Sequence, residues 1–193
     1  MPTVNEIIFS EYDVKCLNFI LGSGDKKQVW PVKVIGKLEE ESEVRKLIKK
    51  GRGVTIKNRT WGTGAGTLKL TAHMPYDLYI LLHGMDADDL ADGVHAYGRD
   101  SRHPEAVVTG DVYDEDDVEK FKAWPSCVVS TGPARSIENG AEEVAETEIE
   151  IGFSPDAAGR GMYEALADTL SNDIKTSWME SFGADLVKKT PTV

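Results

Sequence analysis

The most regular pattern in the sequence is Thr67-Leu-Lys-Leu-Thr-Ala-His-Met-Pro75-Tyr-Asp-Leu-Tyr-Ile-Leu-Leu-His-Gly84. Apolar and polar residues alternate from Thr67 to His73, which is the period of a half-buried strand. Pro75 ends this strand and suits the first turn of a helix, and Gly84 can adopt the left-handed conformation that commonly ends one. The stretch therefore predicts a strand that runs into a short helix over residues 75–83.

The predicted helix is apolar on nearly every side, because only Asp77 and His83 interrupt its apolar and aromatic residues. A helix of this kind needs cover on more than one side. The sheet of its own subunit can supply one cover. The other is either a further layer of the same domain or a neighbouring subunit. The candidate residues for a contact with a neighbouring subunit are Tyr76, Leu78, Tyr79 and Leu82.

The chain has 193 residues and a net charge of −11, and this charge is unevenly distributed. Nine Lys or Arg and four Glu lie between Lys33 and Arg59, whereas twelve acidic residues and two arginines lie between Asp86 and Glu119. The acidic balance argues against a nucleic-acid-binding protein, which gains affinity from basic side chains on phosphates. The two segments are either solvated loops of opposite sign or complementary faces of a self-associating protein.

The length indicates a single domain over residues 1–193, with a short C-terminal tail from residue 170. Because no apolar run reaches about 18 residues and no signal pattern is visible, we expect no contact with a membrane. Cys16 and Cys127 have no metal or redox spacing and are interpreted as reduced core residues. Trp178 and Phe182 indicate that the tail docks on the body or on a neighbour.

The rest of the chain has the pattern of a mainly β protein, with α+β as its class. The segment 142–153 is the clearest of these strands: Ile149 and Ile151 lie on one face and the glutamates on the other. The glutamates are either an ordinary solvent-facing row or the lining of an acidic channel: Glu146, Glu148 and Glu150. Further strands are predicted at 4–9, 14–21, 28–35, 105–112 and 119–131, with Trp30-Pro31 marking an edge strand or bulge.

The segment 39–50 is ambiguous in its secondary structure. Ser42 followed by Val44, Leu47 and Ile48 fits a short capped helix. The segment also runs through Gly51-Arg-Gly53 into a second extended run, which fits a charged hairpin that projects from the body equally well. Both interpretations are open at the level of sequence. The hairpin would be mobile in a free subunit, since it has few apolar anchors.

Two motifs that suggest ligands fail on their spacing. The run Gly62-Thr-Gly-Ala-Gly66 precedes a strand, whereas a dinucleotide fingerprint needs strand, glycines and then helix, so a turn or bulge is favoured. The run Asp86-Ala-Asp-Asp-Leu-Ala-Asp92 places a leucine where a calcium loop needs an oxygen ligand. It is interpreted as an acidic surface loop.

No catalytic constellation emerges from the sequence. The four histidines have no paired metal-ligand spacing, the serines lack a nucleophile elbow, and the cysteines lack an activating neighbour. We therefore expect no enzyme activity, no bound metal and no cofactor. An acidic hydrolase is the weakest interpretation, because no nucleophile, base or metal set can be named for it.

The central stretch and three later segments carry a family resemblance. Those segments are Gly93-Val-His-Ala-Tyr97, Glu105-Ala-Val-Val and the aromatic strand with Trp124-Pro-Ser-Cys127. Together they resemble the major tail proteins, or tail tube proteins, of long-tailed phages of Gram-positive bacteria. The resemblance extends from Gly53 to Ala165 and implies a β-sandwich or barrel-like body with one flanking helix. It also implies a long charged loop at residues 39–59.

The resemblance further implies that subunits form hexameric rings, which stack into a tube that delivers DNA without binding it specifically. Partners would be other copies of the chain and the tape measure, terminator and distal tail proteins. The protein would belong to the virion, in the phage tail, and assemble in the host cytoplasm. Glu146, Glu148 and Glu150 would face the lumen, an inference from their charge and alternation. The loop that reaches the next ring would carry Arg45, Lys46, Lys49, Lys50 and Arg52.

A second hypothesis is a monomeric β-sandwich module that binds a ligand such as a carbohydrate. Its stacking platforms would be exposed tryptophans, with Trp30, Trp61, Trp124 and Trp178 as the candidates. The substitution Leu78→Asp is expected to separate the two hypotheses. A ring-forming protein would lose assembly, whereas a monomeric module with Leu78 in its core would unfold.

Overall fold

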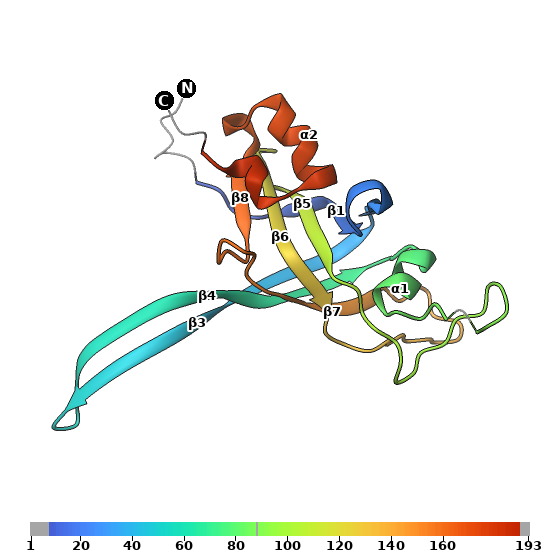
Figure 1. Cartoon of the computed structure of the whole chain (residues 1–193), viewed down its shortest axis with the longest axis horizontal. Helices are drawn as coiled ribbons and strands as arrows, with labels where there is room; N and C mark the ends of the chain where they lie inside the picture. The colour runs from blue at the N-terminus through green and yellow to red at the C-terminus, as the bar shows by residue number, and fades with distance from the viewer. Residues whose placement is uncertain (1–7, 88, 190–193) are drawn as a thin grey trace.

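The computed structural model describes residues 8–87 and 89–189. The protein is mainly β, with two α-helices beside one large antiparallel sheet, so the predicted α+β class is confirmed (Figure 1). The elements, in order, are β1 (Asp13–Leu21), η2 (Gly24–Lys26), β2 (Gln28–Val32), β3 (Ile35–Gly51), β4 (Val54–Ala72), α1 (Tyr76–Leu82), β5 (Ala106–Tyr113), β6 (Glu119–Val129), β7 (Thr147–Phe153), β8 (Tyr163–Leu166), η3 (Ala167–Thr169), α2 (Asn172–Ser181) and η4 (Ala184–Val187).

The strands follow the order β2-β1-β5-β6-β7-β4-β3, and β8 pairs with β6 beside this path. Side chains from strands that are far apart in this order share one core, which shows that the sheet is curled. Leu17 and Phe19 of β1 belong to the same buried cluster as Leu68 and Leu70 of β4. The body is therefore barrel-like around one main core, as the family resemblance implies. β2 is an end strand, which agrees with the edge position predicted from Trp30-Pro31.

Alternation in β4 and β7 places the predicted residues in the core. Leu70 of β4 lies opposite Ile149 of β7, and both are almost fully buried. Their neighbours Lys69 and Glu150 form the next cross-strand pair and lie on the outer face. Burying such aliphatic side chains contributes about 1.5 to 3 kcal/mol each, so this face anchors the sheet.

β6 is buried on both faces, which a simple alternation does not predict. Phe121 and Ala123 pack in a second, smaller core under α2, whereas Trp124 and Cys127 both lie in the main core. The change of parity follows from an irregularity in the pairing with β5, where Ala106 pairs with Cys127 but Val108 pairs with Trp124. An extra residue in one strand reverses the direction of every side chain beyond it.

α2 was not predicted, because the C-terminal tail was expected only to dock. Its buried Trp178 donates a hydrogen bond from Nε1 to the carbonyl oxygen of Lys122 at 3.1 Å, and it packs near Phe121 and Phe182. The tail therefore docks on the body of its own chain. The signal was present in the spacing of Ile174, Trp178 and Phe182, which is the period of one helix face.

The hairpin interpretation of the segment 39–50 is confirmed, because this segment belongs to β3 and pairs with β4. Two predictions of strands need correction. The predicted strand 142–153 is shorter and begins at Thr147. Of the predicted strand 4–9, residues 4–7 lie outside the described residues, and residues 8 and 9 are not in a strand. Within the described residues, no helix has the length and apolar character needed to cross a membrane.

Candidate assembly surfaces

The most conspicuous surface is the outer half of the β3–β4 hairpin, residues 44–61, which we call the arm. Figure 1 shows it extending away from the body as a two-stranded ribbon. It ends in a two-residue turn in which Arg52 and Gly53 have φ values of 49° and 79°. Positive φ at both positions matches the right-handed twist of the strands, so the sequence Gly51-Arg-Gly53 specifies a tight hairpin tip.

The arm combines exposed apolar and basic side chains and has no core of its own. It contains seven Lys or Arg and no Asp or Glu. Its basic residues include the five that were predicted for ring stacking, and all of those five are exposed. The large apolar side chains of the arm are 45% to 68% exposed: Val44, Leu47, Ile48, Val54, Ile56 and Trp61. Exposed apolar groups in such number mark an interaction surface, and a lone two-stranded hairpin is marginally stable in water.

The junction of arm and body is a close-packed bulge. Ser42 pairs with Gly66 and Val44 pairs with Gly62, so three residues of β4 stand opposite one of β3. Gly64 within the bulge has a φ of 78°, and a Cβ there would lie 2.9 Å from Cβ of Pro155. The glycine run is thus a bulge, as favoured from sequence, and its glycines permit close backbone contact with the loop that follows β7.

Below this bulge, a chain of ion pairs ties the base of the hairpin to the body. Lys122 of β6 is buried, and its Nζ lies 2.6 Å from Glu40 of β3 and 2.9 Å from Glu11 of the N-terminal segment. Glu11 also contacts Lys120 at 2.6 Å, which reaches Glu164 at 3.2 Å. Burial alone would lower the pKa of Lys122, but the two carboxylates outweigh this effect and the pKa is raised.

The predicted subunit-contact residues of α1 lie mostly inside the chain. Leu78, Tyr79 and Leu82 are no more than 2% exposed, whereas Tyr76 is 56% exposed. The prediction is therefore corrected for these three, because a further layer of the same chain supplies the second cover. Arg135 stacks on Tyr79, with the guanidinium 4.1 Å from the ring centroid. Leu78→Asp would unfold either kind of protein, so it no longer separates the two hypotheses.

Two histidine rings, His83 and His103, contact each other at the C-terminal end of α1. His83 is fully buried at the C-terminal end of α1, and its Nδ1 lies 2.8 Å from the carbonyl oxygen of Tyr79. The ring of His103 lies edge-on to that of His83, and its Nδ1 lies 2.6 Å from the carbonyl oxygen of Val129. Burial lowers the pKa of His83, although the backbone hydrogen bond partly opposes this effect.

Of the three glutamates predicted to form a row, only two lie together on one face of a strand. Glu148 and Glu150 lie on the outer face of β7, opposite Thr71 and Lys69 of β4. Glu146 precedes the strand, and its carboxylate occupies the space beside Gly36 that the Cβ of any other residue would need. Lys69 also pairs with Glu39 of β3, so a lysine stands between two glutamates across the sheet. The outer face of β3–β4–β7 is hence of mixed charge with an acidic excess.

The acidic segment predicted from Asp86 to Glu119 occupies two separate places. Its first part is a loop near α1, at the opposite end of the molecule from the arm (Figure 1); Asp88 lies outside the described residues. Its second part is the turn between β5 and β6. Here the carboxylate of Asp114 accepts hydrogen bonds from the backbone N–H groups of Asp116 and Val118 at 2.9 Å and 2.8 Å.

The structure also shows the environments of the tryptophans, the cysteines and the residues that could bind a metal. Trp124 and Trp178 are buried, so they are not stacking platforms, and Trp61 on the arm is the tryptophan with a large exposed area. Both cysteines are free thiols, and burial raises the pKa of Cys127 to about 12. Among the described residues, no three His, Cys, Asp or Glu side chains gather as a metal site would require.

Two solved structures resemble this chain in part. A chain of the anti-feeding prophage baseplate, seen by cryo-EM, aligns with 82% of this chain and 97% of its own length, at 12% identity and a TM-score of 0.48. A chain of the anti-feeding prophage tube-terminating cap aligns with 86% of this chain and 100% of its own, at 12% identity and a TM-score of 0.43. No protein-family model matches the chain, and no curated protein is similar to it in sequence.

Proposed function

We propose that this protein is a structural, non-enzymatic subunit that assembles with copies of itself into a phage tail tube. The observation that carries the proposal is the arm, residues 44–61, which exposes apolar and basic side chains outside the folded body. A monomeric module has no evident use for such an arm.

The charge distribution favours a head-to-tail contact between copies. The arm carries seven positive charges, and the rest of the chain is strongly acidic, because the net charge of the whole is −11. Contacts between unlike surfaces of identical subunits form rings or open stacks, rather than closed pairs. The ring of six and the tape measure, terminator and distal tail partners come from the family resemblance. The proposed location is the phage tail, after assembly in the host cytoplasm.

The outer face of β3–β4–β7 is the proposed wall of the DNA channel. Glu148 and Glu150 lie on this face together with Glu39, and Lys69 partly neutralises them. A wall with a modest acidic excess repels phosphates, so DNA passes without adhering. Glu146 lies beside this face, next to Gly36, and would contribute at its margin.

The test removes two of the six exposed apolar side chains of the arm and leaves the body unchanged. The variant Leu47→Ser with Ile48→Ser is expected to keep the circular dichroism spectrum and unfolding midpoint of the wild type, because both side chains are more than half exposed. It is expected to lose assembly in sedimentation velocity. As a matched control, Lys26→Gln with Lys27→Gln alters an exposed turn of the body and should assemble normally. Normal assembly of the arm variant would contradict the proposal.

A further inference from the structure

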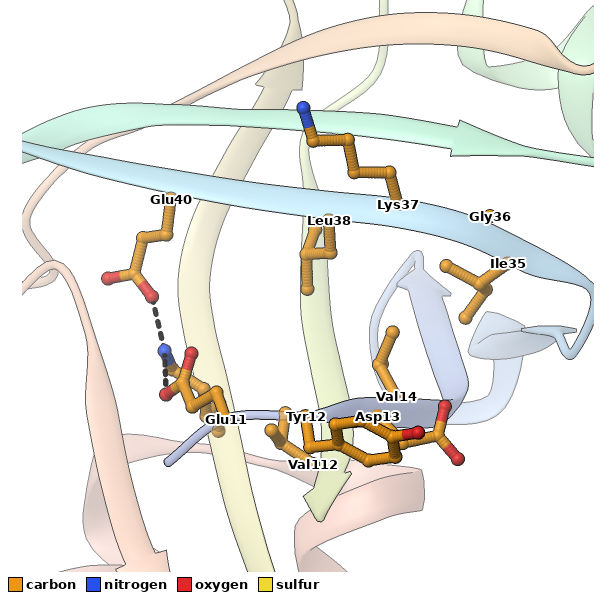
Figure 2. Close-up of a pocket in the computed structure, with 11 residues that line it drawn as sticks. Glu11, Tyr12, Asp13, Val14, Ile35, Gly36, Lys37, Leu38, Glu40 and Val112 are labelled. Carbon is orange, nitrogen blue, oxygen red and sulfur yellow. Dashed lines mark hydrogen bonds and ion pairs between the residues drawn. The ribbon is translucent and has the colours of Figure 1, made fainter. Parts of the chain in front are cut away.

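A cavity of about 230 Å³ lies at the base of the hairpin, between β3 and the N-terminal segment (Figure 2). Its walls include apolar side chains from three elements: Val14 of β1, Ile35 and Leu38 of β3, and Val112 of β5. A volume of this size holds one or two side chains and not a strand. The cavity therefore suits an apolar side chain that a partner presents at a narrow tip.

The rim of this cavity has an excess of one negative charge, because Glu11, Asp13 and Glu40 line it together with Lys37 and Lys122. Glu40 and Glu11 already contact Lys122, whereas Asp13 is exposed and forms no ion pair with any described residue.

The neighbouring β5–β6 turn adds to this negative charge. Asp13 pairs with Tyr113, directly before that turn, and the turn contributes the exposed Glu115 and Asp116. A partner of the cavity should accordingly combine an apolar side chain with basic ones.

The tip of the arm has this composition. Val54 and Ile56 are 68% and 66% exposed beside the two-residue turn, and the nearest charged side chains are Lys50, Arg52 and Lys57. The loop near α1 contributes Met85 and His95 to another cavity, but the described lining of that cavity contains Arg135 and no carboxylate. Of these two cavities, the one at the hairpin base thus matches both properties of the tip.

The tip cannot reach the cavity of its own chain. Arg52 of the turn is eight residue steps from Val44 along an extended strand, which at about 3.3 Å per step places the tip roughly 25 Å from the base. Figure 1 shows the ribbon directed away from the body. Any tip in the cavity must come from a second copy, and the contact would leave that copy's own cavity free for a third.

We propose that the arm tip of one copy inserts Val54 or Ile56 into the cavity at the hairpin base of the next copy. Lys50, Arg52 and Lys57 then face the acidic rim around Asp13. This inference rests on the proposed self-assembly and adds the acceptor surface to it. It selects the cavity rather than the acidic loop near α1 as the surface that the arm meets.

Two charge reversals of equal size test which surface accepts the arm. Asp13→Lys is expected to raise the protein concentration needed for assembly by about tenfold or more, because a rim contact becomes repulsive. Asp92→Lys places the same change in the loop near α1 and is expected to alter the concentration needed for assembly by less than about twofold. Both residues are exposed, so neither variant should change the unfolding midpoint.

Chemical crosslinking gives an independent readout. In a Cys16→Ser, Cys127→Ala background, the pair Tyr12→Cys and Ile56→Cys is expected to yield a ladder of multimers with a short bis-maleimide, since Tyr12 lines the cavity and is 79% exposed. The cavity would be refuted as the acceptor if Asp92→Lys blocked assembly and Asp13→Lys did not. Assembled protein that gave no crosslinked ladder would refute it as well. Neither result would contradict self-assembly itself. A wild type that never assembles would remove the proposed function as well.

Discussion

His83 shows how a single side chain links pH to stability. Its imidazole is fully buried, and burial lowers its pKa below the ordinary value of about 6.5. The unfolded chain therefore takes up a proton at a higher pH than the folded chain does. Stability from the neutral ring is present above about pH 6.5 and declines as the pH falls below that value.

The prediction is a smaller pH dependence in His83→Gln. Its urea midpoint should fall less between about pH 8 and about pH 5 than that of the wild type, even if the variant is less stable throughout. The exposed Gln28 supplies the control, because Gln28→Asn changes no titratable group and should retain the wild-type slope. Equal slopes for His83→Gln and the wild type would refute the assignment.

Glu40 and Glu39 are neighbours on β3 with opposite environments. The Glu40 side chain is 16% exposed and contacts buried Lys122, whereas Glu39 is 55% exposed and pairs with Lys37 at 3.0 Å. Glu40→Gln should cost about 1 to 3 kcal/mol of unfolding free energy, because it removes one of two carboxylates from a buried ammonium. Glu39→Gln should stay within about 0.5 kcal/mol of the wild type. Denaturant titration measures both, and equal costs would contradict the account.

The bulge that joins arm and body needs glycine at Gly66 more than at Gly62. A Cβ on Gly66 would lie 2.3 Å from the carbonyl oxygen of Glu41, whereas Gly62 has open space around it. Gly66→Ala should therefore destabilise the protein by about 1 to 3 kcal/mol through overpacking. Gly62→Ala should be nearly neutral in the same thermal unfolding experiment. If Gly66→Ala were as stable as the wild type, the backbone of the bulge would have to move readily to make room for the added Cβ.

Elements with a clean period were predictable from the sequence. The strand with Leu68 and Leu70 and the helix after Pro75 lie where alternation and turn residues predicted them, and the strand with Ile149 and Ile151 does so from Thr147 onward. The helix–hairpin ambiguity of residues 39–50 could not be resolved locally, because only pairing with residues 54–66 decides it. Half-exposed charged strands carry almost no periodic signal of their own.

The candidate sites were less predictable, since burial depends on partners that are distant in sequence. Nothing in the sequence near Tyr79 reveals that the segment with Ala134 and Arg135 covers it. The ion pair of Lys122 with Glu40 joins residues from different strands, and its sequence neighbours give no sign of it. The basic arm, in contrast, was visible as a charge run, and its exposure follows from that composition.

The lysines of the arm have a second role that a charge count does not reveal. Both edges of a lone ribbon present unpaired backbone groups, and lysine on an edge strand discourages uncontrolled pairing with other chains. Lys46 and Lys49 lie on such a strand, with Trp61 and Leu47 nearby on the ribbon. The arm is thus suited to a specific contact and protected against indiscriminate ones.

At the scale of the whole molecule, the separation of charge predicts how salt affects assembly. A basic arm that meets an acidic rim loses attraction as the Debye length shortens from about 10 Å at 0.1 M salt to about 3 Å at 1 M. Assembly of the wild type should weaken over this range. Lys49→Gln with Lys50→Gln should show a smaller salt effect in light scattering. Assembly that strengthens steadily with salt in both proteins would show that apolar contact alone drives it.

Self-assembly through the exposed arm is the property to measure first. Sedimentation velocity of the wild type at rising concentration, with negative-stain images of the same fractions, measures it. We expect rings or stacked rings with a central hole, and their absence when Leu47 and Ile48 are changed to serine. A wild type that remains a 21.2 kDa monomer at every concentration would show that the arm does not drive self-assembly.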